Sequence, residues 1–577
     1  MHSLWLGLLL ISAQYEPAAP PAAGLGDYQI DKAELQVLSA GATRVSVESQ
    51  SAAPHAGAFP LCFVIDNSKG PRQRLTLSYK GNARELTSAI VRSVDLEAGE
   101  RRRVTVPIPA LLNSGLVEAQ GPGSSGKMSV YFNMLGNTQH SVLALGTTVD
   151  FEELVGATTG SSENDNRVPD TRVLVMAPGD APSEAMSYSG YEMVIITSAD
   201  ALDALSASQR SALESHLLQG GSVVIRGPVR NWSAFPLVGQ AEVTSQPYGL
   251  GTLTVATSSL AKRALVWATP LVNPRAPRSS DEVEGWQLLP QATPTLIRFL
   301  LIIVAFTLVI GPGSFWLARR RGPMILLFSI PFIAVSTCAL IIVSSVLNEG
   351  FSVHTAVYGY TWLDGPRNRA LTFGLGGYYA NLANSSMRLS STSTVLMSQG
   401  NNSERYTAGY RWEEGINLNS DFMPSRRYRE WGLISLEPTR AHVTVKREGT
   451  VLTLQNALGS PISQITVNID GKEYTARGVA DGAAAALQPE RSALPTLVVP
   501  QAVAPPQATM FKRARYGAPT PTEVERFDQH LRDSFTSRPL QPNEFVAAIS
   551  GQGFVPTGGV AAELHDGKHI VRGEISE

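Results

Sequence analysis

Two long uncharged segments constrain this chain more than any other feature of its sequence. Residues 299–318 contain no Asp, Glu, Lys or Arg, and residues 323–347 form a second uncharged run of 25 residues. Twenty helical residues at about 1.5 Å each span about 30 Å, the thickness of the hydrocarbon core of a bilayer. The sequence therefore predicts two transmembrane helices, at 299–318 and 323–347, rather than two helices buried in a soluble core.

The connection between these segments predicts the orientation of the chain. It consists of Arg319, Arg320, Arg321 and Gly322, and is so short that the two helices must be antiparallel neighbours. The positive-inside rule places three arginines in the cytoplasm. Both ends of the hairpin, and the large regions before and after it, are then expected outside the cytoplasm.

The N-terminus agrees with an exported chain. Its apolar stretch at residues 4–11 is too short to span a bilayer but suits the core of a signal peptide, which we expect at residues 1–13. Cys338 lies in the second uncharged segment and cannot pair with Cys62, the other cysteine. An exported chain without an internal disulfide favours a bacterial envelope over a eukaryotic secretory route. The expected location is the bacterial inner membrane, with both large regions extracytoplasmic.

Composition narrows the class of protein further. The 47 basic and 49 acidic residues nearly cancel, which argues against a nucleic-acid partner. A length of 577 residues predicts roughly three to five domains. Only 17% of residues are charged, and 50 Gly and 37 Pro favour many short strands and turns over long soluble helices.

Residues 28–150 have the pattern of a β-sandwich domain. Short apolar or alternating strands are separated by turns, as where residues 61–65 are followed by a Gly-Pro turn at 67–71. The pattern resembles the immunoglobulin-like modules of bacterial surface proteins, although their paired cysteines are absent. Cys62 lies inside the apolar strand, so we expect its thiol to be buried.

The pattern changes at residues 165–275, where we predict an α/β domain of flavodoxin-like type. Apolar strands at 171–177, 191–197 and 222–226 flank a helix at 207–219. Ser206 and Gln209 form the capping box of this helix, and Leu213 and Leu217 provide its apolar stripe.

Residues 191–227 resemble the class I glutamine-amidotransferase-like fold. Enzymes of that family carry a Cys in a Gly-rich elbow, with His and Glu partners. This domain contains no Cys, and His216 has no recognisable nucleophile to serve. The resemblance therefore implies a degenerate domain without amidotransferase chemistry, and we predict no catalytic residue.

The region after the hairpin is expected to be rich in strands. Residues 351–498 predict a β-rich domain whose strands at 443–469 form a second immunoglobulin-like module. This module is either a distant repeat of the first or a convergence on common turn chemistry. Residues 499–522 are predicted to be a linker, followed by a C-terminal helix and strands at 523–577.

The sequence of this region gives little indication of a binding site. His565 and His569 flank Asp566 and Gly567, a dipeptide typical of a hairpin, and the sequence favours a solvated hairpin over a metal site formed by the two histidines and Asp566. Three tryptophans fit core packing better than sugar stacking: Trp362, Trp412 and Trp431. The chain has no P-loop, HExxH, dinucleotide fingerprint or CxxC, so no cofactor and no metal is predicted.

The whole arrangement resembles a family of uncharacterised bacterial envelope membrane proteins. The similar segment is IGPGSFWLARRRGPMILLFSIPFIAV, residues 310–335. The resemblance implies an immunoglobulin-like β-sandwich, a degenerate amidotransferase-like domain and a transmembrane hairpin. We expect a non-enzymatic scaffold or sensor that acts through contacts with envelope or membrane proteins. The alternative is an envelope enzyme or carbohydrate-binding receptor with an unrecognised site.

Overall fold

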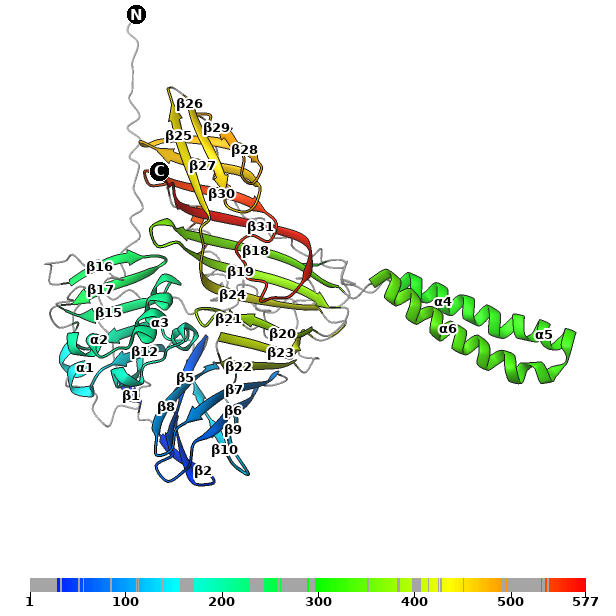
Figure 1. Cartoon of the computed structure of the whole chain (residues 1–577), viewed down its shortest axis with the longest axis horizontal. Coiled ribbons are helices and arrows are strands. Elements are labelled where there is room, and N and C mark those ends of the chain that lie inside the picture. The colour runs from blue at the N-terminus through cyan, green and yellow to red at the C-terminus, as the bar shows by residue number, and fades with distance from the viewer. Residues whose placement is uncertain are drawn as a thin grey trace, which may run out of the picture.

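The computed structural model describes most of residues 28–576. Its larger gaps are residues 156–170, 228–242, 261–287, 397–405 and 496–530, and shorter gaps of one to six residues lie between the other described segments. The predicted signal peptide at 1–13 and most of the predicted linker and C-terminal helix lie outside the described residues. Strands dominate the described chain, and helices are few (Figure 1).

One sheet is parallel except at one edge. Its order is β1-β13-β12-β14-β15-β17-β16, and only β16 is antiparallel to its neighbour. The bounds are β1 Tyr28–Asp31, β12 His140–Leu145, β13 Thr171–Met176, β14 Met193–Ile196, β15 Ser222–Arg226, β16 Val243–Tyr248 and β17 Gly251–Ala256. Both β1 and β12 come from the segment predicted to be a β-sandwich. The predicted limits of 28–150 and 165–275 therefore do not coincide with the sheets.

Helices cover both faces of this parallel sheet, which explains why its strands are apolar throughout. On one face, α3 (Ala207–Leu218) buries Leu213 and Leu217 in the same cluster as Val194 and Ile196. On the other face, α1 (Thr148–Val155) packs in a separate cluster with the alternate residues of the strands. The short α2 (Ala199–Asp203) precedes α3. The predicted helix, its capping box and its apolar stripe are confirmed.

A second set of strands forms two sheets around a shared apolar core. The smaller sheet has the order β2-β3-β5-β8, with bounds Glu34–Ala40, Thr43–Ser49, Ala58–Asp66 and Arg101–Pro109. The larger sheet begins with β10-β9-β6-β7, with bounds Ser124–Tyr131, Ser114–Gly121, Gln73–Ala83 and Leu86–Leu96. Cys62 on β5 is 3% exposed, so its predicted burial is confirmed.

The larger of these sheets continues into the region after the two uncharged segments. Its full order is β10-β9-β6-β7-β22-β23-β20, where β20 is Asn384–Leu389, β22 is Tyr406–Glu413 and β23 is Gly415–Met423. Strand β22 pairs in parallel with β7, from Tyr406 opposite Leu86 to Trp412 opposite Arg92. Residues on both sides of the uncharged segments thus form one sheet (Figure 1). The predicted domains at 28–150 and 351–498 are joined.

The largest sheet contains the C-terminal strands at its centre. Its order is β21-β24-β19-β18-β31-β30-β27-β28. The bounds are β18 Val353–Asp364, β19 Arg369–Ala380, β21 Thr394–Leu396, β24 Tyr428–Pro438, β27 Ile462–Ile469, β28 Lys472–Val479, β30 Glu544–Ser550 and β31 Ala562–Glu574. Arg572 on β31 is fully buried and forms a two-pronged ion pair with Glu544, at 2.7 and 3.0 Å. This pair links β31 to its neighbour β30.

A small sheet covers the end of the largest one and shares a core with it. It contains β25 (His442–Glu448), β26 (Val451–Ala457) and β29 (Ala484–Ala486). The buried Asn456 donates from Nδ2 to the carbonyl of Ser460 at 2.9 Å. In the first region, the buried Asn67 donates in the same way to Pro71 at 2.9 Å. Both turns therefore use one buried asparagine and the same spacing, which a repeat and a convergence explain equally well.

The uncharged segments form helices that project away from the sheets as an antiparallel pair (Figure 1). The first consists of α4 (Leu296–Leu308), a π-helical turn at Val309–Gly313 and α5 (Ser314–Arg321), and the second is α6 (Leu326–Glu349). Pro312 lacks the N–H of a regular turn, which accounts for the π-helical irregularity. Leu300–Arg321 is long and apolar enough to cross a membrane, and a shorter apolar stretch follows at Pro323–Ala339.

Candidate functional site

His216 is the candidate catalytic histidine of the α/β domain, and it lies on α3. Its side chain is buried, with only 2% of its surface exposed. Its ring lies 5.7 Å from that of Tyr188, and a Cβ at Gly221 would come within 2.3 Å of its Nε2. Among the described residues neither ring nitrogen has a hydrogen-bond partner, and burial lowers the pKa of His216 to about 4. The neutral ring therefore fills space between α3 and the chain around it.

The polar side of α3 contacts the region that follows the two uncharged helices in the sequence. Glu214 accepts hydrogen bonds from the Tyr248 hydroxyl at 2.8 Å and from the Arg369 guanidinium at 3.1 Å. Arg369 also binds Asp364 at 3.0 Å. One turn further along, Gln219 exchanges hydrogen bonds with residues 392 and 394. These polar groups therefore join two distant parts of the chain, and sequence reasoning gave no sign of the interface.

A polar crevice of about 200 Å³ lies between β8 and the N-terminus of α3. Two of the three arginines that line it are paired with carboxylates, Arg92 with Glu184 at 2.7 Å and Arg103 with Asp180 at 3.2 Å. The third, Arg102, donates to the carbonyl of Asp95 at 3.3 Å. Arg103 also donates to the Cys62 thiol at 2.9 Å. Burial raises the pKa of that thiol to about 12, so it stays protonated. The paired charges and the protonated thiol fit a structural role.

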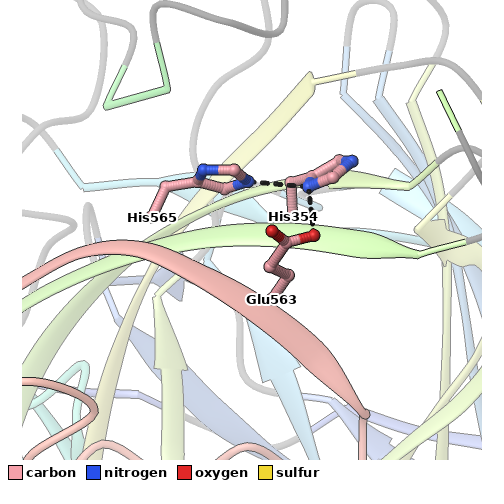
Figure 2. Close-up of side chains that lie close together, drawn as sticks. All are labelled: His354, Glu563 and His565. Atoms are coloured by element: carbon pink, nitrogen blue, oxygen red, sulfur yellow. Dashed lines mark hydrogen bonds and ion pairs between the residues drawn. The ribbon is translucent and has the colours of Figure 1, made fainter. Parts of the chain in front are cut away.

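The described residues contain one group of three side chains able to hold a metal ion: His354, Glu563 and His565. Figure 2 shows one ring nitrogen of His354 joined by dashed lines to His565 and to Glu563. This nitrogen, Nδ1, lies 2.7 Å from Nε2 of His565 and 3.5 Å from the carboxylate of Glu563. His354 lies near the start of β18, and the other two lie near the start of β31. These strands are neighbours in the middle of the largest sheet. Two imidazoles and a carboxylate can bind a cation together or hydrogen-bond to one another.

This cluster differs from the metal site considered from the sequence, which consisted of His565, Asp566 and His569. His569 is 1% exposed and donates from Nε2 to the carbonyl of Gly551 at 3.1 Å, while burial lowers its pKa to about 4. Asp566 accepts a hydrogen bond from Tyr358 at 2.5 Å. The predicted hairpin at Asp566 and Gly567 is wrong, because β31 runs straight through it. Gly567 is needed for close packing, since a Cβ there would lie 1.9 Å from the Gly551 carbonyl oxygen.

The three tryptophans do not form an exposed group. Trp412 and Trp431 are 4% and 3% exposed, and Trp431 stacks on Tyr378 at 4.1 Å. Trp362 is partly buried, with its ring 6.2 Å from that of Phe535. A sugar-binding surface would need exposed tryptophan rings, and these three side chains pack against other residues instead.

The comparisons with known proteins leave the family open. No protein-family model matches the chain, and a search of curated proteins finds no match.

Proposed function

We propose that the chain is a membrane-anchored protein of the bacterial inner membrane, with both large regions outside the cytoplasm. The observation that carries this proposal is the pairing of β7 with β22. These strands lie on opposite sides of the uncharged helices in sequence, so both must occupy one compartment. A chain that leaves and returns to one compartment crosses the membrane an even number of times, as a two-helix hairpin does.

The surface of the helical pair supports burial in lipid. Most of the large apolar side chains that are exposed in the described chain lie on these helices and on the short turn that joins them. They are Leu300, Leu301, Ile303, Val304, Leu308, Val309, Phe315, Trp316, Met324, Leu327, Phe328, Ile330, Phe332 and Val335. In water, a contiguous apolar surface of this kind is unfavourable, whereas a bilayer covers it.

The far end of the pair has the charges of a cytoplasmic turn. Arg319 lies over the ring of Phe315 at 4.7 Å, and Arg320 lies over the ring of Trp316 at 4.2 Å. Aromatic and basic side chains next to one another are typical of a membrane interface. The helical pair therefore ends where lipid would give way to the cytoplasm.

Within the extracytoplasmic part, we propose a non-enzymatic scaffold or sensor that acts through protein contacts. The polar groups of α3 are used in the interface with residues 364–394, and His216 packs in the interior. The alternative is an envelope enzyme or carbohydrate receptor. His216→Leu tests an enzyme that uses His216 as its base: such an enzyme loses cellular function while the fold survives, whereas a scaffold retains it.

Reporter fusions test the topology. Fusions after Asn273 and Glu577 are expected to report an extracytoplasmic location, and an insertion at residues 319–322 a cytoplasmic one. Replacement of the three arginines by Glu is expected to disturb insertion. A cytoplasmic signal at Glu577 contradicts the proposal. Crosslinking in intact membranes, followed by capture of the chain, then identifies the envelope proteins that it contacts.

A further inference from the structure

The donor atoms of the His354–Glu563–His565 cluster are spaced for a small cation. They all lie within 4.8 Å of one another. Bonds of about 2.0–2.1 Å in tetrahedral geometry place ligand atoms roughly 3.3 Å apart. The separation of 3.5 Å between His354 Nδ1 and the Glu563 carboxylate already fits. The 2.7 Å between the two imidazole nitrogens must lengthen by roughly 0.6 Å, and His565 is an exposed side chain that can move.

The other ring nitrogen of His354 supports the same assignment. Its Nε2 lies 3.3 Å from the Ser352 hydroxyl. In the tautomer that donates from Nε2 to Ser352, Nδ1 presents a lone pair toward the Glu563 carboxylate. In this tautomer a cation at the site is attracted both by the Nδ1 lone pair and by the Glu563 carboxylate, which lie 3.5 Å apart. Metal-binding imidazoles usually have their second nitrogen held by such a hydrogen bond.

A strand irregularity places the third donor. Strands β18 and β31 are parallel, with His354 opposite Glu563 and Thr355 opposite Leu564. The next pair is Ala356 with Asp566, so His565 is an extra residue in β31. Bulges are rare in parallel pairs, and they re-aim side chains beside functional sites. Here the bulge frees His565 from the ladder, and its imidazole meets His354.

We propose that His354, Glu563 and His565 form a binding site for a divalent transition-metal ion, with zinc as the ion that fits best. Two imidazole nitrogens favour zinc over calcium and magnesium, which prefer oxygen donors. Three protein ligands leave a fourth position for water or another ligand. The Glu563 side chain is 61% exposed, so an ion can reach the site from solvent.

The position of the site gives the ion a structural consequence. His354 follows the end of α6 at Glu349 by five residues, whereas its partners belong to the C-terminal strand. A bound ion therefore cross-links the strand that leaves the helical pair to the end of the chain. This consequence rests on the proposed membrane anchoring, whereas metal binding itself does not.

Zinc titration of the purified full-length protein in detergent tests the site. A coloured zinc chelator competes for the ion after the protein has been stripped of metal. Wild-type protein is expected to take one zinc ion per chain from the chelator. His354→Ala, His565→Ala and Glu563→Gln are each expected to weaken binding at least about tenfold. The matched control is His442→Ala, since His442 is an exposed histidine on another sheet.

Two readouts keep the result decisive. Glu563→Gln changes an exposed side chain and retains its shape, so it tests the site even where a histidine variant fails to fold. Cobalt(II) in place of zinc is expected to give the visible absorption of a tetrahedral site in wild-type protein and to lose it in Glu563→Gln. Absence of zinc uptake by wild-type protein, or equal uptake by wild type and all three variants, overturns the proposal. Neither result depends on the membrane topology.

Discussion

Glu214 on α3 binds the guanidinium of Arg369 at 3.1 Å, although the two uncharged helices separate these residues in the sequence. Their side chains are only 12% and 20% exposed. Together with the β7–β22 pairing, this ion pair joins the regions on either side of the helical pair. The part of the chain outside the helical pair is thus one assembly built from two stretches of sequence.

Removal of one partner of this pair is expected to destabilise the assembly. Arg369→Met leaves the carboxylate of Glu214 buried without its guanidinium, which costs about 3 kcal/mol in the free energy of unfolding. The matched control is Arg447→Met, because Arg447 binds Asp470 in an ion pair whose side chains are 59% and 73% exposed. Denaturant unfolding is expected to show a change below about 1 kcal/mol for that control. Equal changes in both variants would show that the buried Glu214–Arg369 pair contributes no more than an exposed ion pair.

His216 is expected to make stability depend on pH. Its pKa is about 4 in the folded protein and about 6.5 in the unfolded chain, so the unfolded state binds more protons between these values. Stability is therefore lost as the pH falls from about 6.5 to about 4. His216→Leu removes this contribution and flattens the dependence in that window, whereas the similarly buried His569 keeps its own share. Denaturant midpoints of both proteins across the window measure the difference. Parallel curves contradict the buried neutral ring.

Cys62 is expected to resist thiol reagents in the native protein. Burial raises the pKa of its thiol to about 12, and the thiolate is the reactive form. In a Cys338→Ala background, a maleimide should label Cys62 only after the addition of denaturant. Mass spectrometry of the labelled protein measures this. Rapid labelling without denaturant rejects the position of Cys62 on β5.

Local features of the fold were predictable from sequence, because nearby residues determine them. Ser206 and Gln209 fix the start of α3 through a capping box, and Leu213 and Leu217 follow the helical period. Cys62 lies in an apolar run whose burial needs no knowledge of its partners. In each case the physical cause lies within a few residues.

Features that depend on distant pairing were not predictable. Nothing in residues 406–413 identifies β7 as the neighbour of β22, because main-chain hydrogen bonds carry no sequence information. Likewise, β1 and β12 pair with β13 in the parallel sheet, although both precede it in the sequence and were predicted to belong to another domain. The metal cluster was missed for the same reason, since His354 and His565 meet only through the pairing of β18 with β31. Gly567 was misread because a glycine needed for close packing resembles a glycine needed for a turn.

We predict one specific disulfide in living cells. Val91 on β7 lies opposite Arg411 on β22, and adjacent strands hold Cα atoms at a separation that a disulfide can bridge. The test protein carries Val91→Cys and Arg411→Cys, with Cys62 and Cys338 replaced by Ala. The control pairs Arg411→Cys with Lys80→Cys, because Lys80 lies one strand further away on β6.

Mass spectrometry of peptides from intact bacteria, blocked with a thiol reagent before lysis, is the most direct measurement. The bacterial envelope outside the cytoplasm is oxidising, whereas cytoplasmic thiols stay reduced. We expect a bond between the cysteines at 91 and 411 without added oxidant, and no bond between those at 80 and 411. Free thiols at 91 and 411 in those cells would contradict the shared sheet or its place outside the cytoplasm.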